Sequence, residues 1–405
     1  MYQDRERLDA LMAAEIEVFR AARGASLAEF AKAAEHLPDG VPMLWMAKWP
    51  GPWPVYVAEA SGAHFTDLDG IDHVDLCLGD TGAMCGHAPA ASVAALQAQL
   101  AHGSTFMLPT TAAAKAGALL AERFGLPQWQ FTLSATDANR ALIRYARHVT
   151  GRPKILVHDF SYHGTVDETF ATLDADGSVI ARRGNIGAPV PLSQTTAVVP
   201  FNDVPALEAA LATGEIAAVL IEPALTNIGI VLPDAGYLAA VREACTRHGA
   251  ILIHDETHTL CAGPGGYTAE HGLAPDAIVL GKTIGGGIPA AALGMSREFA
   301  DRVATSIELE DIDVGGVGGT LAGNALSLAG IVATLSEVLT PEAYGSMVDR
   351  ATEWTVGVQA AIDEFEVPWQ VTQLGARAEY SFRETAPADG REAADADDFE
   401  LQQYL

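Results

Sequence analysis

Short apolar runs alternate with helical patterns from about residue 90 onwards. Several runs are apolar along most of their length, as in WQFTLS, KILVHD, TAVVPF, AAVLIEPA, AILIHDE and DAIVLGK. Apolar positions at helical spacing predict helices over 137–149 and 234–248 between these runs. The alternation predicts an α/β fold with a largely parallel sheet covered on both faces. Because ligands in such sheets bind beyond the carboxyl ends of the strands, polar residues at those ends are the first candidates for chemistry.

The two ends of the chain have other patterns. Residues 4–35 are predicted to form one or two amphipathic helices, and the Pro/Trp-rich stretch 37–54 an irregular arm, because proline removes a hydrogen-bond donor and fixes φ. VYVAEASGAHFTDLDG is typical of a hairpin that turns at Ser61-Gly62. The acidic, alanine-rich stretch 383–400 is predicted to be a loop, and the sequence stops inside what we expect to be the start of a helix.

Composition narrows the class of protein. The 405 residues are 49% hydrophobic and carry a formal net charge of −28, which argues against a nucleic-acid partner because phosphate backbones require clustered Lys and Arg. The four cysteines have no C-x-x-C spacing, and the N-terminus lacks the apolar core of a signal peptide. No run of eighteen apolar residues occurs. We therefore expect a cytoplasmic protein with no membrane contact.

A lysine and an aspartate each end an apolar strand. Lys282 follows DAIVL-G, and Asp255 ends AILIHD; no other of the five lysines has such a place. The G-K-T at Lys282 is not a P-loop, because Asp276 stands where that motif needs glycine. A lysine there can form an imine with an aldehyde cofactor, and pyridoxal phosphate also needs a carboxylate against its ring nitrogen. A surface lysine and a turn-capping aspartate are the alternative interpretation.

Other residues fit the same chemistry. Ser134, Ala135 and Thr136 lie where a strand runs into a helix, and open N–H groups at a helix N-terminus bind phosphate, although an ordinary N-cap has the same pattern. Tyr162 follows another strand and can stack on a planar ring or pack in the core. The glycine-rich stretch 314–324 presents Thr320.

These motifs, in this order, resemble the class III aminotransferases, which include glutamate-1-semialdehyde aminomutase. The similarity rests on S-x-T-[DE]-A, Y-H-G, E-P, D-E-x-H, the lysine and G-G-T-x-x-G-N, from about Val55 to Asn324, and is weaker in LGARAEYSF. It implies a fold-type I enzyme with a mostly parallel seven-stranded sheet, pyridoxal 5′-phosphate as cofactor, and a homodimer with active sites at the interface. The implied division is 1–89 (N-terminal helices, arm and small-domain hairpin), 90–325 (large cofactor domain) and 326–405 (small α/β domain, which we expect to be incomplete).

The resemblance also implies roles for individual residues. Lys282 becomes the Schiff-base lysine and proton shuttle, and Asp255 the partner of the pyridine nitrogen. The remaining cofactor-binding residues are Ser134, Ala135, Thr136, Tyr162, Glu222, Thr257, His258 and Thr320, the last reaching the phosphate of a neighbouring subunit. The sequence departs from the family at Ala135 (usually glycine), Asp137 (glutamate), Thr257 (valine) and Leu321 (phenylalanine).

Several functions stay open at this point. The preferred interpretation is ping-pong transfer of an amino group between an amino acid or amine and a keto acid. Arg377 is the candidate carboxylate clamp, with a salt bridge to Glu379 as the alternative, and Trp53 is a candidate for the pocket entrance. The first alternative is a 2,1-aminomutase of the glutamate-1-semialdehyde type, and the second a catalytically impaired cofactor-binding protein. His254 and His258 are not expected to bind zinc, because they belong to a strand-like pattern rather than to H-E-x-x-H on a helix.

Overall fold

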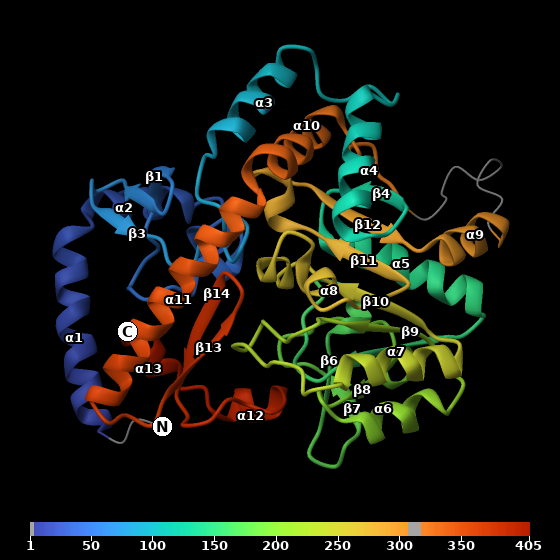
Figure 1. Ribbon diagram of the computed structural model, residues 1–405. Coiled ribbons are helices and arrows are strands. Elements are labelled where there is room, and N and C mark those ends of the chain that lie inside the picture. The colour runs from blue at the N-terminus through green and yellow to red at the C-terminus, as the bar shows by residue number, and fades with distance from the viewer. Residues whose placement is uncertain (1–3, 307–316) are drawn as a thin grey trace.

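A seven-stranded sheet forms the centre of the protein, whose computed structural model describes residues 4–306 and 317–405 (Figure 1). The strands lie in the order β4, β12, β11, β10, β9, β5, β8. β9, β10 and β11 run parallel to one another, as do β5, β8 and β9, whereas β12 is antiparallel to β11 and β4. The predicted mostly parallel seven-stranded sheet is confirmed, and the antiparallel β12 makes it mixed. The bounds are β4 Gln128–Thr132, β5 Lys154–His158, β8 Thr196–Val199, β9 Ile216–Ile221, β10 Ile251–Asp255, β11 Ala277–Leu280 and β12 Ala291–Met295.

Helices cover both faces of this sheet, as the apolar strands require. Along β10, Ile251 and Ile253 pack in the core that contains α5 (Ala135–Thr150) and α9 (Arg297–Ser306). Leu252 points to the other face and packs with α6 (Val204–Leu211) and α7 (Tyr237–His248), as the two-residue period of a strand dictates. A third core joins α4 (Thr111–Phe124) and α10 (Ala325–Ala333) to the sheet. Of the seven strands, only β12 lacked a sequence prediction, because AALGM contains no β-branched residue.

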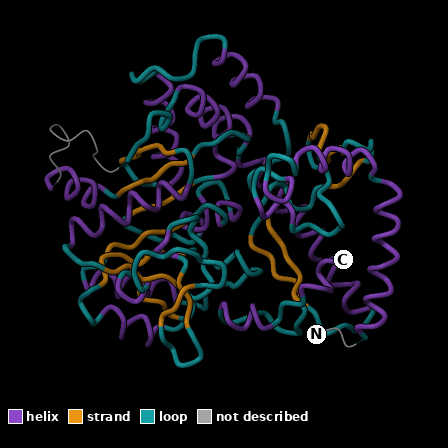
Figure 2. Tube along the Cα trace, turned by 180° about the vertical axis from the view of Figure 1, so that it is seen from behind, coloured by secondary structure: helices purple, strands orange, loops and turns teal. Residues whose placement is uncertain are grey.

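The N- and C-terminal segments lie side by side at one side of the sheet (Figures 1 and 2). Arg5 pairs with the buried carboxylate of Asp398 at 2.6 Å, which ties the first helix to the last. The predicted hairpin is present as β1 and β2, but Ser61 pairs with His64, so the turn is Gly62-Ala63 rather than Ser61-Gly62. The elements of this region are α1 Arg5–Ala22, α2 Gly24–Ala33, β1 Val57–Ser61, β2 His64–Asp67, β3 Asp72–Val74, α11 Pro341–Glu364, β13 Gln370–Leu374, β14 Arg377–Ser381, α12 Gly390–Asp395 and α13 Phe399–Tyr404.

The loop prediction for 383–400 is wrong in part. Asp389 and Asp398 cap the helices α12 and α13, each accepting a hydrogen bond from a backbone N–H three residues on. Capping by acidic residues at these two points starts helices inside a stretch whose composition alone suggests a loop. The remaining elements are α3 Ala90–Leu100, β6 Ala171–Leu173, β7 Val179–Ala181 and α8 Gly266–Glu270.

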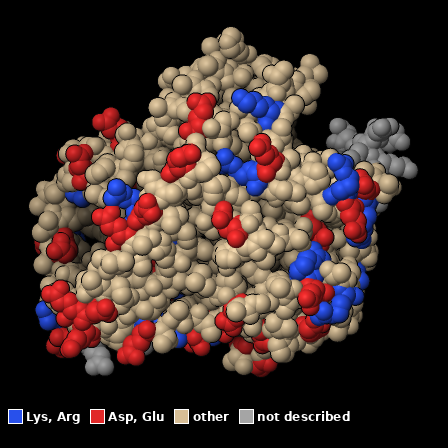
Figure 3. All heavy atoms as spheres, viewed as in Figure 1, with Lys and Arg blue, Asp and Glu red and all other residues tan. Residues whose placement is uncertain are grey.

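The surface carries the acidic character of the composition. In Figure 3 acidic side chains are spread over the visible face, and the Lys and Arg groups lie among them. Within residues 4–306 and 317–405, no helix has the length and apolar character needed to cross a membrane.

The backbone after β11 is supported by a helix that touches it closely. Lys282–Gly285 form a short 3₁₀ turn, and a Cβ placed on Gly330 of α10 would lie 2.6 Å from the carbonyl oxygen of Gly285. No real Cβ fits at that distance, so glycine at position 330 lets α10 press against the turn that carries Lys282.

We therefore expect Gly330→Ala to lower the free energy of unfolding by about 1–3 kcal/mol, the usual cost of overpacking. The matched control is Gly345→Ala, also within a helix, where an added Cβ meets nothing within 4 Å. This control should be neutral or stabilising by up to about 1 kcal/mol. Denaturant unfolding of the two variants measures the difference; equal stabilities would contradict the close contact.

Candidate cofactor and active site

Eight of the predicted site residues meet in one cavity of about 280 Å³. The cavity lies beyond the carboxyl ends of β4, β5, β10 and β11, where an α/β sheet binds its ligands. These eight are Ser134, Ala135, Thr136, Tyr162, Asp255, Thr257, His258 and Lys282, and the other lining residues are Leu133, Gly164, Ile288, Pro289 and Ala290.

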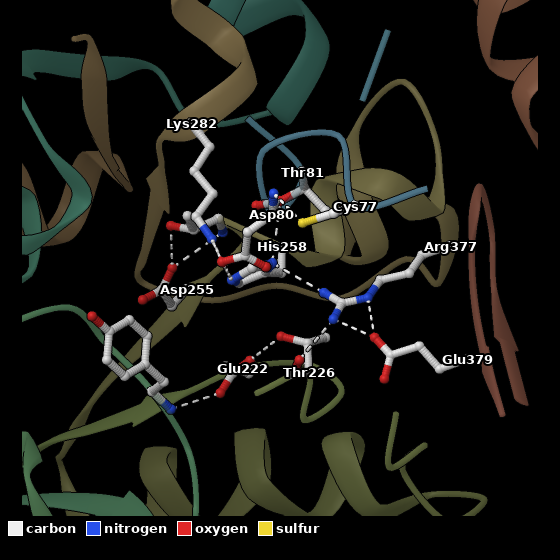
Figure 4. Close-up of polar contacts among 12 residues, drawn as sticks. Cys77, Asp80, Thr81, Glu222, Thr226, Asp255, His258, Lys282, Arg377 and Glu379 are labelled. Atoms are coloured by element: carbon white, nitrogen blue, oxygen red, sulfur yellow. Dashed lines mark hydrogen bonds and ion pairs between the residues drawn. The ribbon is translucent and has the colours of Figure 1, made fainter. Parts of the chain in front are cut away.

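Lys282 holds its amine at the centre of a polar cluster (Figure 4). Its Nζ lies 2.6 Å from Asp80 Oδ2 and 2.6 Å from His258 Nε2. Burial lowers the pKa of the amine, and the nearby Arg377 charge adds to this, against the opposing effect of Asp80 and Asp255. The residue has φ of 49°, a left-handed conformation that costs energy for any residue with a Cβ. The fold therefore supports backbone strain where the amine is presented.

Asp255 is a buried carboxylate surrounded by donors. Oδ2 lies 2.8 Å from Asn139 Nδ2 and 3.0 Å from His163 Nδ1, while Oδ1 accepts from the backbone N–H and hydroxyl of Thr257 at 3.1 and 2.6 Å. Burial alone raises the pKa of a carboxyl group, but the bonds from His163, Thr257 and Asn139 outweigh it and hold the pKa of Asp255 below its usual value. The group is therefore ionised at neutral pH.

Thr257 makes a polar contact through its hydroxyl and an apolar contact through its methyl group. Its hydroxyl is turned to Asp255, and a Cβ built on Gly281 would lie 3.5 Å from its Cγ2 methyl. The methyl group thus faces Gly281, the residue before Lys282, and supplies an apolar surface at the position where the resemblance implies a valine. The departure at Thr257 keeps the apolar contact and adds a donor to the carboxylate.

The N-terminus of α5 forms another part of the cavity wall. Ser134 is the N-cap: its hydroxyl accepts from Asp137 N at 3.2 Å and donates to Asp137 Oδ2 at 2.7 Å. The N–H groups of a first helical turn have no partner within the helix, so those of Ala135 and Thr136 suit an anion. Thr136 Oγ1 accepts from Thr165 N at 3.1 Å. This bond holds the segment after β5, which includes Tyr162, against the first turn of α5.

Glu222 lies behind Tyr162 rather than in the cavity wall. Its carboxylate accepts from Tyr162 N at 2.8 Å and from the Thr226 hydroxyl at 2.5 Å, and only 2% of the residue is exposed. Burial raises the pKa of Glu222. The residue holds the backbone next to the Tyr162 ring.

Arg377 reaches the site from β14 on the far side of His258. Its Nε donates to Glu379 Oε1 at 2.6 Å, its Nη2 to the carbonyl of Thr226 at 2.9 Å, and Nη1 lies 3.1 Å from His258 Nδ1. The salt bridge with Glu379, offered above as the alternative, is present. Arg377 also lines a second hollow of about 540 Å³, together with Asp80 and Thr81.

Two of the predicted residues lie elsewhere. Trp53 packs edge-on against Phe19 of α1, with ring centroids 5.5 Å apart, and lines neither hollow described above. Thr320 is exposed and does not line the cavity of its own chain, and residues 314–316 of its glycine-rich stretch fall outside the described residues. Their proposed contacts stay predictions.

The histidines weighed above as zinc ligands have different partners. His254 Nδ1 bonds the Thr268 hydroxyl at 2.8 Å, whereas His258 faces Lys282. In the described part of the chain, no group of three or more His, Cys, Asp or Glu residues is arranged to hold a metal ion.

Sequence reasoning missed Asp80, Asn139 and His163. Asn139 is fully buried on α5 among apolar neighbours, and a polar residue on that face was the available signal. His163 belongs to the Y-H-G motif, whose tyrosine alone was given a role. Asp80 lies in LGDTG, where Leu78, Asp80 and Thr81 have positive φ, and the stretch carries no recognisable pattern.

The sequence model of aminotransferase class-III proteins matches residues 45–386. The chain belongs to the aminotransferase class-III family. It is 34% identical over 351 residues to the glutamate-1-semialdehyde 2,1-aminomutase of Anaeromyxobacter dehalogenans strain 2CP-C, covering 85% of this chain and 80% of that protein.

Solved structures agree with the family. The crystal structure of a glutamate-1-semialdehyde aminomutase from Pseudomonas aeruginosa PAO1 superposes with a TM-score of 0.97 at 46% identity, covering 99% of this chain and 89% of that one. A lysine-to-alanine form of that aminomutase was crystallised in complex with PMP. An omega-transaminase from Sphaerobacter thermophilus gives a TM-score of 0.85 at 30% identity, covering 93% and 86%.

The class III family cofactor is pyridoxal 5′-phosphate, and the residues of the cavity fit it. An ionised carboxylate suits a protonated ring nitrogen, a lysine with a lowered pKa suits an aldehyde, and a helix N-terminus suits a phosphate. The three features lie around one cavity of the right scale, since small-ligand pockets begin at roughly 300 Å³.

We expect Thr257→Val to weaken cofactor binding at acidic pH, because the substitution removes the hydroxyl that donates to Asp255. The substitution keeps a methyl group, so the apolar contact is retained. The pKa of Asp255 should rise, so the pH below which the carboxylate protonates should move up by about one unit. Cofactor affinity measured against pH checks this. Thr257→Ser keeps the hydroxyl and should follow the wild type; identical profiles for all three proteins would contradict the role.

Proposed function

We propose that this class III enzyme is a 2,1-aminomutase acting on glutamate-1-semialdehyde or a closely related amino aldehyde. The observation that carries the proposal is the 46% identity to the Pseudomonas aeruginosa aminomutase over 99% of the chain, with a TM-score of 0.97. The curated relatives at 34% and 32% identity are aminomutases as well. This interpretation replaces intermolecular transfer as the preferred reaction.

The cavity supplies what such a reaction demands of the protein. When bound, pyridoxal phosphate provides an aldehyde that condenses with amines and a ring that withdraws electrons from the adjoining carbon. Asp255, held charged by Asn139, His163 and Thr257, keeps a proton on the ring nitrogen. The N-terminus of α5 would hold the phosphate at the wall of the cavity that Lys282 also lines.

Lys282 is the proton carrier in this proposal. Its amine lies at the cavity wall with a lowered pKa, so its neutral form is accessible and Nζ can take a proton from one substrate carbon and return it to another. Glu222 accepts from the backbone N–H of Tyr162 and so holds this residue at the cavity wall, where its ring would stack on the cofactor. Amino migration within one molecule needs no second substrate, so these groups suffice.

A homodimer is part of the proposal. Phe106, Met107, Leu108 and Leu321 are exposed apolar side chains, and the bond from Ala325 N to Ser104 O brings their two loops together. A second copy that covers these loops would bury apolar surface and bring Thr320 of one chain near the cavity of the other.

Intermolecular transamination is the second candidate. The omega-transaminase from Sphaerobacter thermophilus supports it with a TM-score of 0.85, although its identity of 30% is lower than that of the aminomutase. Both reactions use every residue named above, so they differ in the substrate accepted and not in the cofactor site.

The deciding experiment compares substrates on one preparation. Purified holoenzyme should convert glutamate-1-semialdehyde to 5-aminolevulinate without an added amino donor or acceptor. Pyruvate and 2-oxoglutarate, each tested with a panel of amines, give the transaminase arm. Turnover only with a donor–acceptor pair would contradict the aminomutase and support transamination. Lys282→Ala should bind the cofactor without a bond that borohydride can reduce, and lose roughly 10²–10⁴-fold in kcat; full activity would exclude Lys282 as the proton carrier.

Arg377 is the proposed clamp for the substrate carboxylate, because guanidinium matches a carboxylate at two oxygens. Arg377→Ala should raise KM by about tenfold to hundredfold while cofactor affinity stays the same. Arg350→Ala is the control: this exposed arginine on α11 lines the same hollow and pairs with Glu353 of its own helix. An unchanged KM in Arg377→Ala would leave the salt bridge with Glu379 as its function.

A further inference from the structure

His258 lies between the side chains of Lys282 and Arg377. Its Nε2 lies 2.6 Å from Lys282 Nζ, and its Nδ1 lies 3.1 Å from Arg377 Nη1 and 3.2 Å from Thr81 Oγ1 (Figure 4). Only 7% of the residue is exposed, so water does not compete for these positions. Each contact requires one hydrogen-bond donor and one acceptor, which restricts where the protons are.

The assignment starts from Arg377. A guanidinium stays protonated and only donates, so Nδ1 of His258 has to be the acceptor in that contact. The Thr81 hydroxyl can donate its hydrogen either to Nδ1 or to the carbonyl oxygen of Asp80, which lies 2.6 Å away. The Thr81 contact therefore allows Nδ1 to be unprotonated, whereas the Arg377 contact requires Nδ1 to be unprotonated.

The same reasoning fixes the state of the lysine. With Nδ1 unprotonated, a neutral imidazole carries its hydrogen on Nε2, which faces Lys282. An ammonium group has three donors and no acceptor, so the 2.6 Å contact is satisfied only if Lys282 is an amine whose lone pair accepts from Nε2–H. One N–H of this amine then donates to Asp80 Oδ2.

We propose that Arg377, acting through the tautomer of His258, holds Lys282 as the neutral amine. Both are positioning residues, and the inference rests on the proposed role of Lys282 as the proton carrier. Arg377 thereby sets the protonation of a group that it does not touch.

The electrostatics agree with this arrangement. Burial, with a smaller contribution from the charge of Arg377, lowers the pKa of His258 to about 3, so the ring stays neutral. Around the pair, Asp80 and Asp255 oppose a neutral lysine and Arg377 favours it. The Tyr162 phenol, with a pKa raised by burial, stays uncharged.

The same contacts describe a second state. If a substrate carboxylate draws Arg377 away, Nδ1 loses its donor. His258 can then carry its proton on Nδ1 and donate to Thr81 Oγ1, while Nε2 becomes an acceptor for a protonated Lys282. Arg377 at Nδ1 thus corresponds to the tautomer protonated at Nε2, and Thr81 at Nδ1 to the tautomer protonated at Nδ1. When a substrate carboxylate binds Arg377, the second tautomer lets Lys282 hold the proton that it takes from substrate.

Nitrogen NMR of the apoenzyme tests the tautomer directly. Protein labelled with ¹⁵N-histidine gives separate signals for protonated and unprotonated ring nitrogens, and His258→Gln identifies the pair that belongs to this residue. Wild-type His258 should be protonated at Nε2 and unprotonated at Nδ1. Protonation at Nδ1 in the ligand-free protein would overturn the proposal.

Chemical labelling of the apoenzyme tests the effect on the lysine. The rate at which Lys282 reacts with an amine-specific reagent, followed by peptide mass spectrometry against pH, gives the midpoint at which the amine forms. Arg377→Met should raise this midpoint by about one pH unit, the size of a single-charge effect at such distances. Arg350→Met should leave it unchanged.

A double-mutant cycle separates action through His258 from direct charge repulsion. In a His258→Leu background, Arg377→Met should shift the midpoint by less than half as much as in the wild type. An equal shift in both backgrounds would mean that Arg377 acts only through space, and would overturn the proposal. Neither measurement uses cofactor or turnover, so a failed substrate test would not affect them. If a variant does not fold, the NMR measurement on the wild type still decides.

Discussion

The site depends on keeping a buried carboxylate charged. Asp255 lies at the end of a central strand, where burial favours its neutral form, and four hydrogen bonds reverse that preference. Three of the donor groups come from separate parts of the chain: Asn139 from α5, His163 from the segment after β5, and Thr257 from the residues after β10 itself. The packing of helix and strands around the sheet thus determines the charge of one side chain.

Lys282 presents the opposite problem, since a lysine is charged by default and the proposed chemistry needs its free amine. Burial and the neighbouring arginine favour the amine, and Asp80 opposes them. The protein therefore places within one small cavity a carboxylate whose environment favours the charged form and an amine whose environment favours the neutral form. Opposite adjustments of neighbouring groups of this kind are a mark of functional sites.

Much of the sheet and of the cofactor site could be predicted from sequence, because a change from apolar to polar residues marks where a buried strand ends. The runs before Asp255 and Lys282 are continuous and apolar, so both residues were placed correctly at the carboxyl edge. Asp80 could not be found in this way, because its position depends on three positive-φ residues in a loop far away in sequence. Trp53 could not be placed for a different reason: an aromatic residue in an irregular arm has no periodicity to show which way it faces. Its ring packs against Phe19, and its place at the pocket entrance stays a prediction.

The loop that carries Lys282 joins two strands that are hydrogen-bonded neighbours, β11 and β12. Both ends of the loop continue into interior strands of the sheet. The ends of the loop therefore cannot move apart without breaking the hydrogen bonds between β11 and β12. Movement of the amine is then limited to rotation about the bonds of its own side chain, which takes picoseconds to nanoseconds for accessible groups. The amine would therefore reorient much faster than a collective motion of whole segments, which takes microseconds to milliseconds.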